Sequence, residues 1–182
     1  MSEATLLLDR AHLDQVMRNL TDEILALPWA QSGGDFPWFI GIRRGGVAVA
    51  HELARLVGVT LGTAPQVGAL DISMYRDDMW LKGPRIAEGQ TELPGDLTGR
   101  RVMLVDDVLY TGRTVRAALN AVVDFGRPQS VGLAVLLDRG GRELPIAPDA
   151  TGYRLDVPPD CKVQVRCDSA GRLHSVVQVH NE

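Results

Sequence analysis

The sequence has few cysteines, few aromatic residues and no long apolar run. Two of its 182 residues are cysteine, and 5% are aromatic. If the segment CKVQVRC is a strand, Cys161 and Cys167 lie about 20 Å apart, which is beyond the reach of a disulfide. Neither a C-x-x-C pair nor a histidine at ligand spacing indicates a zinc site. We therefore expect two reduced thiols.

No part of the sequence has the pattern of a secretory signal or a membrane span. The first residues, MSEATLLLDR, lack a basic start followed by a long apolar stretch. The net charge is -4, so the chain as a whole does not attract nucleic acid or an anionic membrane, and such binding would need a local patch. We expect a cytoplasmic protein with no membrane partner.

The rest of the composition is that of an ordinary globular protein. Hydrophobic residues make up 45% and charged residues 23%, and the length fits a single domain over residues 1–182. Apolar periodicity predicts three helices, at 13–27 after an Asp9 cap, 47–58 and 114–125. Apolar runs predict strands, at 38–42, 67–77, 101–105 and 130–137, and a terminal hairpin at 161–180. The alternation predicts an α/β fold, mainly a parallel twisted sheet flanked by helices on both faces.

In a parallel sheet, ligands bind at the carboxyl ends of the strands. That rule places three loops on one rim of the sheet: 43–46, 106–114 and 138–143. Segment 77–98 is rich in charge, glycine and proline and has no periodicity. A loop of this length inside a compact domain usually has a function, so we expect a mobile lid over the rim.

The stretch VDDVLYTGRT runs from a buried strand through two carboxylates into a helix. Helix N-termini bind anions, Gly112 lets the backbone approach a ligand, and the hydroxyls of Thr111 and Thr114 add donors. This pattern predicts a phosphate site. A carboxylate pair repels phosphate, so Asp106 and Asp107 must face a partner rich in donors, either sugar hydroxyls or a divalent metal. The combination is typical of a ribose 5-phosphate site.

Three motifs resemble one known family. VDDVLYTGRT resembles the phosphoribosyl diphosphate (PRPP) signature of type I phosphoribosyltransferases. Together with DISMYRDD and LDRGGRELPI, it resembles the PyrR family of pyrimidine operon attenuators with uracil phosphoribosyltransferase activity. The resemblance covers residues 39–152 and implies a type I phosphoribosyltransferase fold with a mobile hood loop. It implies a pentosyltransferase that converts uracil and PRPP to UMP and diphosphate, with Mg²⁺ held mainly by PRPP and water.

The resemblance also implies roles for individual residues. Asp106 and Asp107 would hold the ribose 2′- and 3′-hydroxyls and, with Arg44, carry the catalysis. The rest of the PRPP loop would bind substrate: Val108, Leu109, Tyr110, Thr111, Gly112, Arg113 and Thr114. The last four of these residues would hold the 5′-phosphate. The pyrophosphate loop would consist of Arg43, Arg44, Gly45 and Gly46.

The remaining roles concern the lid and the base. Tyr75, Arg76 and Asp77 would touch PRPP when the lid closes, although Tyr75 also suits ordinary packing. Uracil would lie against the main chain of Leu137, Asp138 and Arg139. Tyr110 stands where purine-specific relatives carry an acid, which favours a pyrimidine substrate.

Departures from the family pattern concern the residues that bind RNA in other members. The first helix is acidic, and Gly141, Ala147 and Tyr153 stand where RNA-binding members carry basic residues, so that only Arg142 remains. Because RNA affinity depends on phosphate neutralisation, we expect weak RNA binding. Gly45 also stands where many members carry arginine. The alternative function is a regulator that senses UMP or UTP and binds RNA or a protein with little turnover. The family's habit also implies a homo-oligomer.

Overall fold

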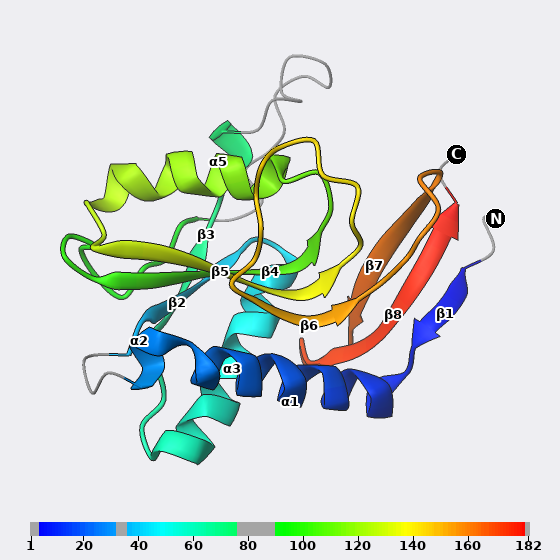
Figure 1. Ribbon diagram of the computed structural model, residues 1–182, viewed down its shortest axis with the longest axis horizontal. Coiled ribbons are helices and arrows are strands. Elements are labelled where there is room, and N and C mark those ends of the chain that lie inside the picture. The colour runs from blue at the N-terminus through cyan, green and yellow to red at the C-terminus, as the bar shows by residue number, and fades with distance from the viewer. Residues whose placement is uncertain (1–3, 32–35, 76–89, 181–182) are drawn as a thin grey trace.

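The computed structural model describes residues 4–31, 36–75 and 90–180. Within these ranges the chain forms a parallel sheet, helices that cover it, and a smaller antiparallel sheet (Figure 1). In chain order the elements, with η for a 3-10 helix, are β1 (Thr5–Leu8), α1 (Arg10–Ala26), α2 (Pro28–Gln31), β2 (Trp38–Ile42), α3 (Gly45–Leu61), β3 (Val67–Leu70), η1 (Ser73–Tyr75), β4 (Arg101–Leu109), α5 (Arg113–Val122), η2 (Val123–Phe125), β5 (Ser130–Asp138), β6 (Ala150–Arg154), β7 (Cys161–Cys167) and β8 (Leu173–His180). No helix in these ranges is long and apolar enough to cross a membrane.

The parallel sheet has the strand order β3-β2-β4-β5-β6 among the described residues. All neighbouring strands run parallel, so their carboxyl ends lie at one edge of the sheet. α1 and α3 cover one face, and α5 covers the other (Figure 1). The predicted α/β fold with helices on both faces is confirmed.

Two apolar clusters fill the space between the sheet and its helices. Leu20, Val49 and Met103 belong to the cluster on the α1 and α3 face. Ile40 and Val115 belong to the cluster on the α5 face. Because the central strands are buried on both faces, they consist of nearly continuous apolar runs, which is why they were predictable.

The start of the first helix follows the predicted cap. The Asp9 carboxylate accepts the N–H of His12 at 2.9 Å and thereby satisfies one of the free donors at the start of α1. The helix ends at Ala26, before Pro28, which begins the short α2.

Several predicted boundaries are wrong for local reasons. The helix expected to end at Gly58 continues to Leu61, because the left-handed C-cap is Gly62, with φ 76°. The strand expected over 67–77 stops at Leu70, because the Asp71 carboxylate accepts the N–H of Ser73 at 2.8 Å and turns the chain into η1.

Two further predicted elements have different ends in the structure. The strand expected over 101–105 runs on to Leu109, because its pairing with β5 continues to Asp138. The helix expected to reach Phe125 changes to the 3-10 helix η2 after Val122.

The sequence analysis missed β1 and β6. β1 is four residues long and is held by pairing with β8, far along the chain. β6 lies within a glycine- and proline-rich stretch and pairs parallel to β5, with Leu137 opposite Tyr153. Short strands of this kind depend on tertiary pairing, so neither has an apolar pattern of its own.

β7 and β8 form an antiparallel pair that β1 extends into the second sheet. At their turn, the Asp168 carboxylate accepts the N–H groups of Ala170 and Arg172, each at 2.9 Å. This turn corresponds to the DSAGR segment from which a hairpin was expected.

The predicted lid, 77–98, falls largely outside the described residues, which omit 76–89. Its described end is packed rather than free. Glu92 pairs with Ala69 through two main-chain hydrogen bonds of 2.7 and 2.8 Å, and Leu97 is fully buried. The end over 90–98 is therefore part of the framework beside β3.

Gly46 permits α3 to begin directly against β4. A Cβ atom at this position would lie 2.2 Å from the Val105 carbonyl oxygen, which is backbone and cannot rotate away. We expect Gly46→Ala to lower the free energy of unfolding by about 1–3 kcal/mol, measured by urea denaturation. Gly95→Ala is the control, because its Cβ would meet only the Trp38 ring at 3.5 Å. Equal unfolding midpoints for the two variants would contradict this account of Gly46.

Candidate functional site

Three loops meet at the carboxyl edge of the parallel sheet, as the topology rule predicted. The Arg139 N–H donates to the Leu109 carbonyl at 3.1 Å, and the Glu143 N–H donates to the Thr111 carbonyl at 3.0 Å. A Cβ on Gly45 would lie 2.0 Å from an Asp107 carboxylate oxygen, so the loop after β2 is in close contact with the end of β4. One rim thus brings together 43–46, 106–114 and 138–143.

The two adjacent carboxylates belong to β4 itself rather than to the loop after it. Asp106 is buried, with 5% of its surface exposed, and accepts the Asp107 N–H at 3.0 Å. Desolvation raises the pKa of Asp107, against the opposing effect of hydrogen bonds with the Asp106 side chain and the Val108 N–H. A ligand that donates hydrogen bonds to this carboxylate would replace its lost hydration and favour the charged form.

The phosphate loop leads from this pair into α5. Gly112 is the residue before the helix, and its φ of 92° is a conformation that favours glycine. The Arg113 N–H approaches the Thr111 hydroxyl at 3.4 Å, and the Arg116 N–H bonds the Gly112 carbonyl at 3.0 Å. The first-turn N–H groups of α5 therefore open onto the rim, where they suit an anion. Arg113 itself forms an exposed ion pair with Glu143 at 2.6 Å.

The loop after β2 carries two arginines beside Asp107. The Arg43 guanidinium forms an ion pair with Glu92 at 2.9 Å, and its main-chain N–H bonds the Leu70 carbonyl at 3.0 Å. The Arg43–Arg44 peptide bond is cis, and Arg44 is exposed. Arg43 is therefore held by an acid, and Arg44 is an exposed residue of the same loop.

The third loop forms a braced wall. Asp138 pairs with the Arg142 guanidinium at 2.7 Å, and Arg142 also donates to the Tyr110 carbonyl at 2.8 Å. Arg139 lies with its guanidinium 4.1 Å from the centre of the Tyr110 ring. It also donates to the carbonyls of Pro158 and Cys161 at 3.1 and 2.7 Å. The side chain of Arg139 therefore supports this wall.

Some main-chain groups of this wall are already used in hydrogen bonds within the protein. The Arg139 N–H bonds Leu109, the Gly140 N–H bonds the Asp138 carboxylate at 2.9 Å, and the Asp138 carbonyl accepts from Leu155 at 2.8 Å. Each carbonyl oxygen can accept a second hydrogen bond. The main chain of 138–140 can therefore still accept hydrogen bonds from a base through its carbonyl oxygens.

A cavity of about 510 Å³ opens beside this wall. Its lining includes Tyr110, Arg139, Gly141 and Arg154. Another cavity, of about 650 Å³, lies beside Trp38 and Gln66, where β2 and β3 begin. Ligands of parallel sheets bind at the opposite, carboxyl edge, so the cavity beside Tyr110 is the better candidate.

The structure does not bring Tyr75 to the site. The Tyr75 hydroxyl hydrogen-bonds the Asp124 carboxylate, an interaction that raises the Tyr75 pKa. Asp124 follows the C-terminus of α5, and at 1.5 Å per residue it lies roughly 15 Å from the phosphate loop at the start of that helix. In this arrangement the Tyr75 hydroxyl is used in packing against Asp124, and its contact with PRPP on closure of the lid stays a prediction. Arg76 and Asp77 lie outside the described residues.

Sequence reasoning missed the contacts of three residues near the rim. Glu92 neutralises Arg43 from a segment interpreted as lid, and Arg142, interpreted as the basic residue that remains for RNA, is used inside the third loop. Cys167 lies close enough to Asp107 for that carboxylate to contribute to its titration. No local pattern predicts these contacts, because each joins segments far apart in the sequence.

Cys167 provides a chemical probe of the charge at Asp107. Burial raises the pKa of the Cys167 thiol, and the charges of Asp107 and Asp168 raise it further. Alkylation requires the thiolate, so we expect iodoacetamide to modify Cys167 slowly at pH 8 and faster in Asp107→Asn. Peptide mass spectrometry measures the rate, with Asp22→Asn, an exposed change on α1, as control. An equal rate in both variants would contradict the assigned proximity.

Comparison with known proteins agrees with this geometry. A family model described as "Phosphoribosyl transferase domain" matches residues 7–171. The chain is 43% identical to the "Bifunctional protein PyrR" of Geobacter sulfurreducens, over 97% of this chain and 98% of that protein. It is 49% identical to the protein of the same name from Chloroflexus aurantiacus, over 76% of each chain.

Solved structures show the same fold at low sequence identity. A hypoxanthine phosphoribosyltransferase of Trypanosoma cruzi aligns with a TM-score of 0.70 at 17% identity, over 98% of this chain and 97% of that one. A hypoxanthine-guanine phosphoribosyltransferase of Bacillus anthracis aligns with a TM-score of 0.63 at 16% identity, over 86% and 85%. At such identities these likenesses concern the fold alone.

Proposed function

The chain belongs to the PyrR family of phosphoribosyltransferases, and from this premise we propose that its three-loop rim transfers ribose 5-phosphate from PRPP to N1 of uracil. In that reaction the bond from C1′ of ribose to diphosphate breaks, the bond from C1′ to N1 forms, and the N1 proton is released. The observation that carries the proposal is the pair formed by the buried Asp106 and the half-buried Asp107 at the entrance to the α5 phosphate cradle.

The carboxylate pair would act on the ribose. Loss of diphosphate gives C1′ and the ring oxygen positive character, and fixed negative charge nearby stabilises such a transition state. The ribose hydroxyls would donate to the two carboxylates, while the 5′-phosphate would accept from the first N–H groups of α5. Holding both ends of the sugar fixes C1′ between the leaving group and the base.

The loop after β2 would receive the diphosphate. Arg44 is an exposed cationic residue of this loop, and the close approach of Gly45 to Asp107 brings the loop to the reacting sugar. Mg²⁺ bound to the diphosphate fits this place beside the Asp107 carboxylate, because it prefers carboxylate, phosphate and water ligands. When bound to diphosphate, Mg²⁺ would neutralise part of the leaving group's charge.

The wall formed by Tyr110 and 138–139 would receive uracil. Uracil N3–H is a donor and suits one of the carbonyl oxygens of Asp138 or Arg139, which keep a free lone pair. The Tyr110 ring, stacked on Arg139, gives the pocket a flat surface at the position where purine-specific relatives carry an acid. A purine that needs protonation would gain nothing from this side chain.

Product analysis with purified protein, PRPP and Mg²⁺ tests this assignment. We expect UMP and diphosphate in equal amounts from uracil, and kcat/KM for hypoxanthine at least about 100-fold lower. Formation of IMP as readily as UMP would refute the choice of base. No product from either base would refute the enzymatic assignment and favour a nucleotide-sensing regulator.

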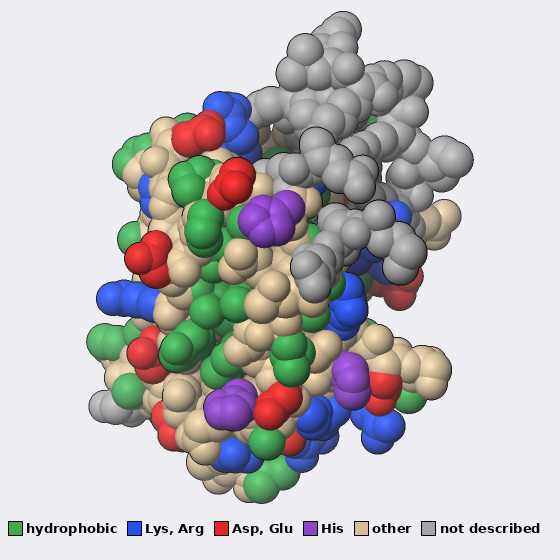
Figure 2. Space-filling model, turned by 90° about the vertical axis from the view of Figure 1, so that its right-hand side faces the viewer, with side chains coloured by type: hydrophobic (Ala, Val, Ile, Leu, Met, Phe, Trp, Pro, Cys, Tyr) green, Lys and Arg blue, Asp and Glu red, His purple; other side chains and the backbone are tan. Residues whose placement is uncertain are grey.

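We also propose a pyrimidine-responsive regulatory function, because the relatives carry the name "Bifunctional protein PyrR". RNA is a poor candidate partner for the described surface. Arg142 is engaged with Asp138 and Tyr110, and Ala147 and Tyr153 offer no charge. On the face formed by the three-stranded sheet, basic side chains are interspersed with acidic ones (Figure 2). A direct test of RNA binding decides whether regulation uses it.

We expect this protein to bind pyrimidine-leader RNA at least about ten times more weakly than a relative with basic residues at the three positions. Ala147→Arg with Tyr153→Lys should tighten binding and steepen the salt dependence by about 1.4 in log–log slope. Gly141→His is unsuitable, because Gly141 has φ 69° and a Cβ there would lie 2.4 Å from the Tyr110 ring. Filter binding at several salt concentrations measures both quantities. Tight, steeply salt-dependent binding by the unmodified protein would contradict this prediction.

A further inference from the structure

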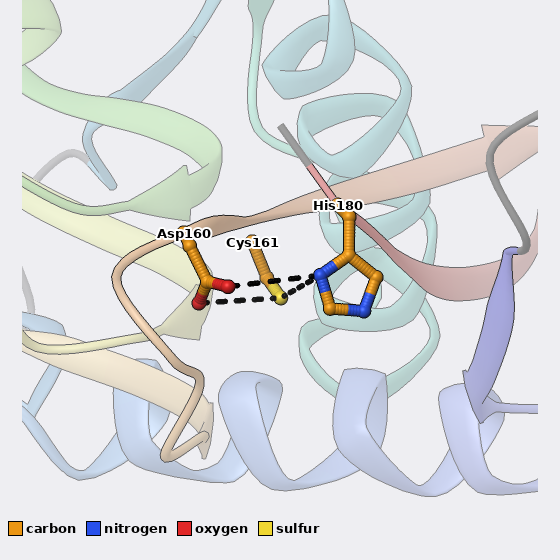
Figure 3. Close-up of side chains that lie close together, drawn as sticks. All are labelled: Asp160, Cys161 and His180. Atoms are coloured by element: carbon orange, nitrogen blue, oxygen red, sulfur yellow. Dashed lines mark hydrogen bonds and ion pairs between the residues drawn. The ribbon is translucent and has the colours of Figure 1, made fainter. Parts of the chain in front are cut away.

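A second cluster of reactive side chains lies at the open end of the terminal hairpin. Cys161 begins β7 and His180 ends β8, and the two are register partners across the antiparallel pair. Asp160 immediately precedes Cys161. Asp160, Cys161 and His180 point toward one another (Figure 3). None of them belongs to the three-loop rim.

The donor atoms of this cluster are spaced like the ligands of one metal ion. The Cys161 Sγ lies 3.4 Å from His180 Nδ1 and 3.8 Å from an Asp160 carboxylate oxygen. His180 Nδ1 lies 3.7 Å from the other Asp160 oxygen. A tetrahedral zinc ion, with bonds of about 2.3 Å to sulfur and about 2.0 Å to nitrogen and oxygen, requires ligand separations of roughly 3.3–3.5 Å. Each of these separations lies within about 0.5 Å of the required one, and rotation of the Asp160 carboxylate would bring a single oxygen toward both partners.

We propose that Asp160, Cys161 and His180 form a zinc-binding site. A mixture of thiolate, imidazole and carboxylate suits zinc, whereas Mg²⁺ prefers oxygen ligands alone. Because three protein ligands occupy three tetrahedral positions, the fourth falls to water. The site ties the first residue of β7 to the last residue of β8 and so closes the hairpin at the end opposite its turn.

The same side chains do not suit a cysteine nucleophile. In a catalytic triad one imidazole nitrogen faces the nucleophile and the other faces the carboxylate. Here Nδ1 of His180 faces both the Cys161 sulfur and the Asp160 carboxylate. The three donors therefore converge on one point, as metal ligands do, instead of forming a relay.

The surroundings of the sulfur support a metal site. Cys161 is 1% exposed, and its Sγ accepts a hydrogen bond from the Gln178 side chain at 3.1 Å. A donor of this kind orients a metal-bound thiolate from outside the ligand set. The side chains of Asp160 and His180 are 72% and 66% exposed, so an ion can enter from solvent. The Cys161 carbonyl is held by Arg139 at 2.7 Å, which fixes the backbone of this ligand.

Zinc titration of the reduced protein against a chromophoric chelator, with excess Mg²⁺, tests the site. We expect one tightly bound Zn²⁺ per chain. Cys161→Ser and His180→Ala should each weaken binding at least about 100-fold, and Gln178→Ala should weaken it about 10-fold. The matched controls, Cys167→Ser and His174→Ala, change the same residue types on the same two strands and should bind zinc as the unmodified protein does. Asp107→Asn, at the separate rim, should also bind normally.

Cobalt substitution adds a spectroscopic readout of the bond between the metal and the Cys161 thiolate. Co²⁺ bound to a thiolate gives a charge-transfer absorption, which should be present in the unmodified protein and Cys167→Ser and absent in Cys161→Ser. Zinc should raise Tm in the unmodified protein and not in His180→Ala, whose exposed side chain can be removed without disturbing the core. Failure of the unmodified protein to retain zinc, or equal zinc affinity in His180→Ala, would overturn the proposal.

Discussion

Asp107→Asn is expected to reduce kcat for UMP formation by about 100-fold or more, equivalent to ~3 kcal/mol of lost transition-state stabilisation. The change removes the negative charge that we propose to lie beside C1′, while keeping the size of the side chain. An asparagine oxygen can still accept the Val108 N–H that Asp107 accepts at 3.0 Å, so the local geometry should persist. Steady-state kinetics with saturating PRPP measures the effect.

Stability provides the control for this variant. Desolvation raises the pKa of Asp107 in the folded state, so the folded protein binds that proton more tightly than the unfolded chain. The stability that protonated Asp107 contributes is therefore fully present below the unfolded pKa. It is lost as the pH rises through the folded pKa, because the ionised carboxylate then disfavours folding. At neutral pH and above, Asp107→Asn should leave Tm unchanged or raised. Near wild-type turnover, or inactivity together with a lowered Tm, would contradict the assigned role.

Arg139→Met is expected to destabilise the protein by about 3 kcal/mol, because it leaves two carbonyl groups without their charged donor. Those acceptors, on Pro158 and Cys161, receive hydrogen bonds of 3.1 and 2.7 Å from the buried guanidinium. For a chain of this size the loss corresponds to a fall in Tm of roughly 6–12 °C, measurable by calorimetry.

Arg166→Met is the matched control for Arg139, because Arg166 is exposed on β7. It should change the free energy of unfolding by no more than about 0.5 kcal/mol. If both variants have the same Tm as the unmodified protein, Arg139 does not support the wall of the proposed base pocket.

The central part of the site was predictable because its information is local. VDDVLYTGRT holds a strand, a turn and a helix start in ten consecutive letters, and the parallel topology then fixes which loops share its rim. Gly112 could be assigned a role before its φ of 92° was known, because a residue without a side chain lets the backbone approach a ligand.

Contacts between distant segments could not be predicted. Tyr75 bonds Asp124, and Arg142 donates to the Tyr110 carbonyl, because tertiary packing brings these groups together. The absence of a histidine near Cys161 in the sequence argued against a metal site. The β7–β8 register nevertheless places His180 beside it, and spacing along the chain cannot reveal a cross-strand neighbour. Assembly into a homo-oligomer stays a prediction.

A crystal structure of the protein with UMP is the most direct test of the proposed site. The account predicts the 5′-phosphate on the N–H groups of 111–114 and the ribose hydroxyls on Asp106 and Asp107. It predicts uracil against the wall of Tyr110 and 138–139. UMP bound in the cavity beside Trp38, or with its ribose hydroxyls away from both carboxylates, would contradict the account.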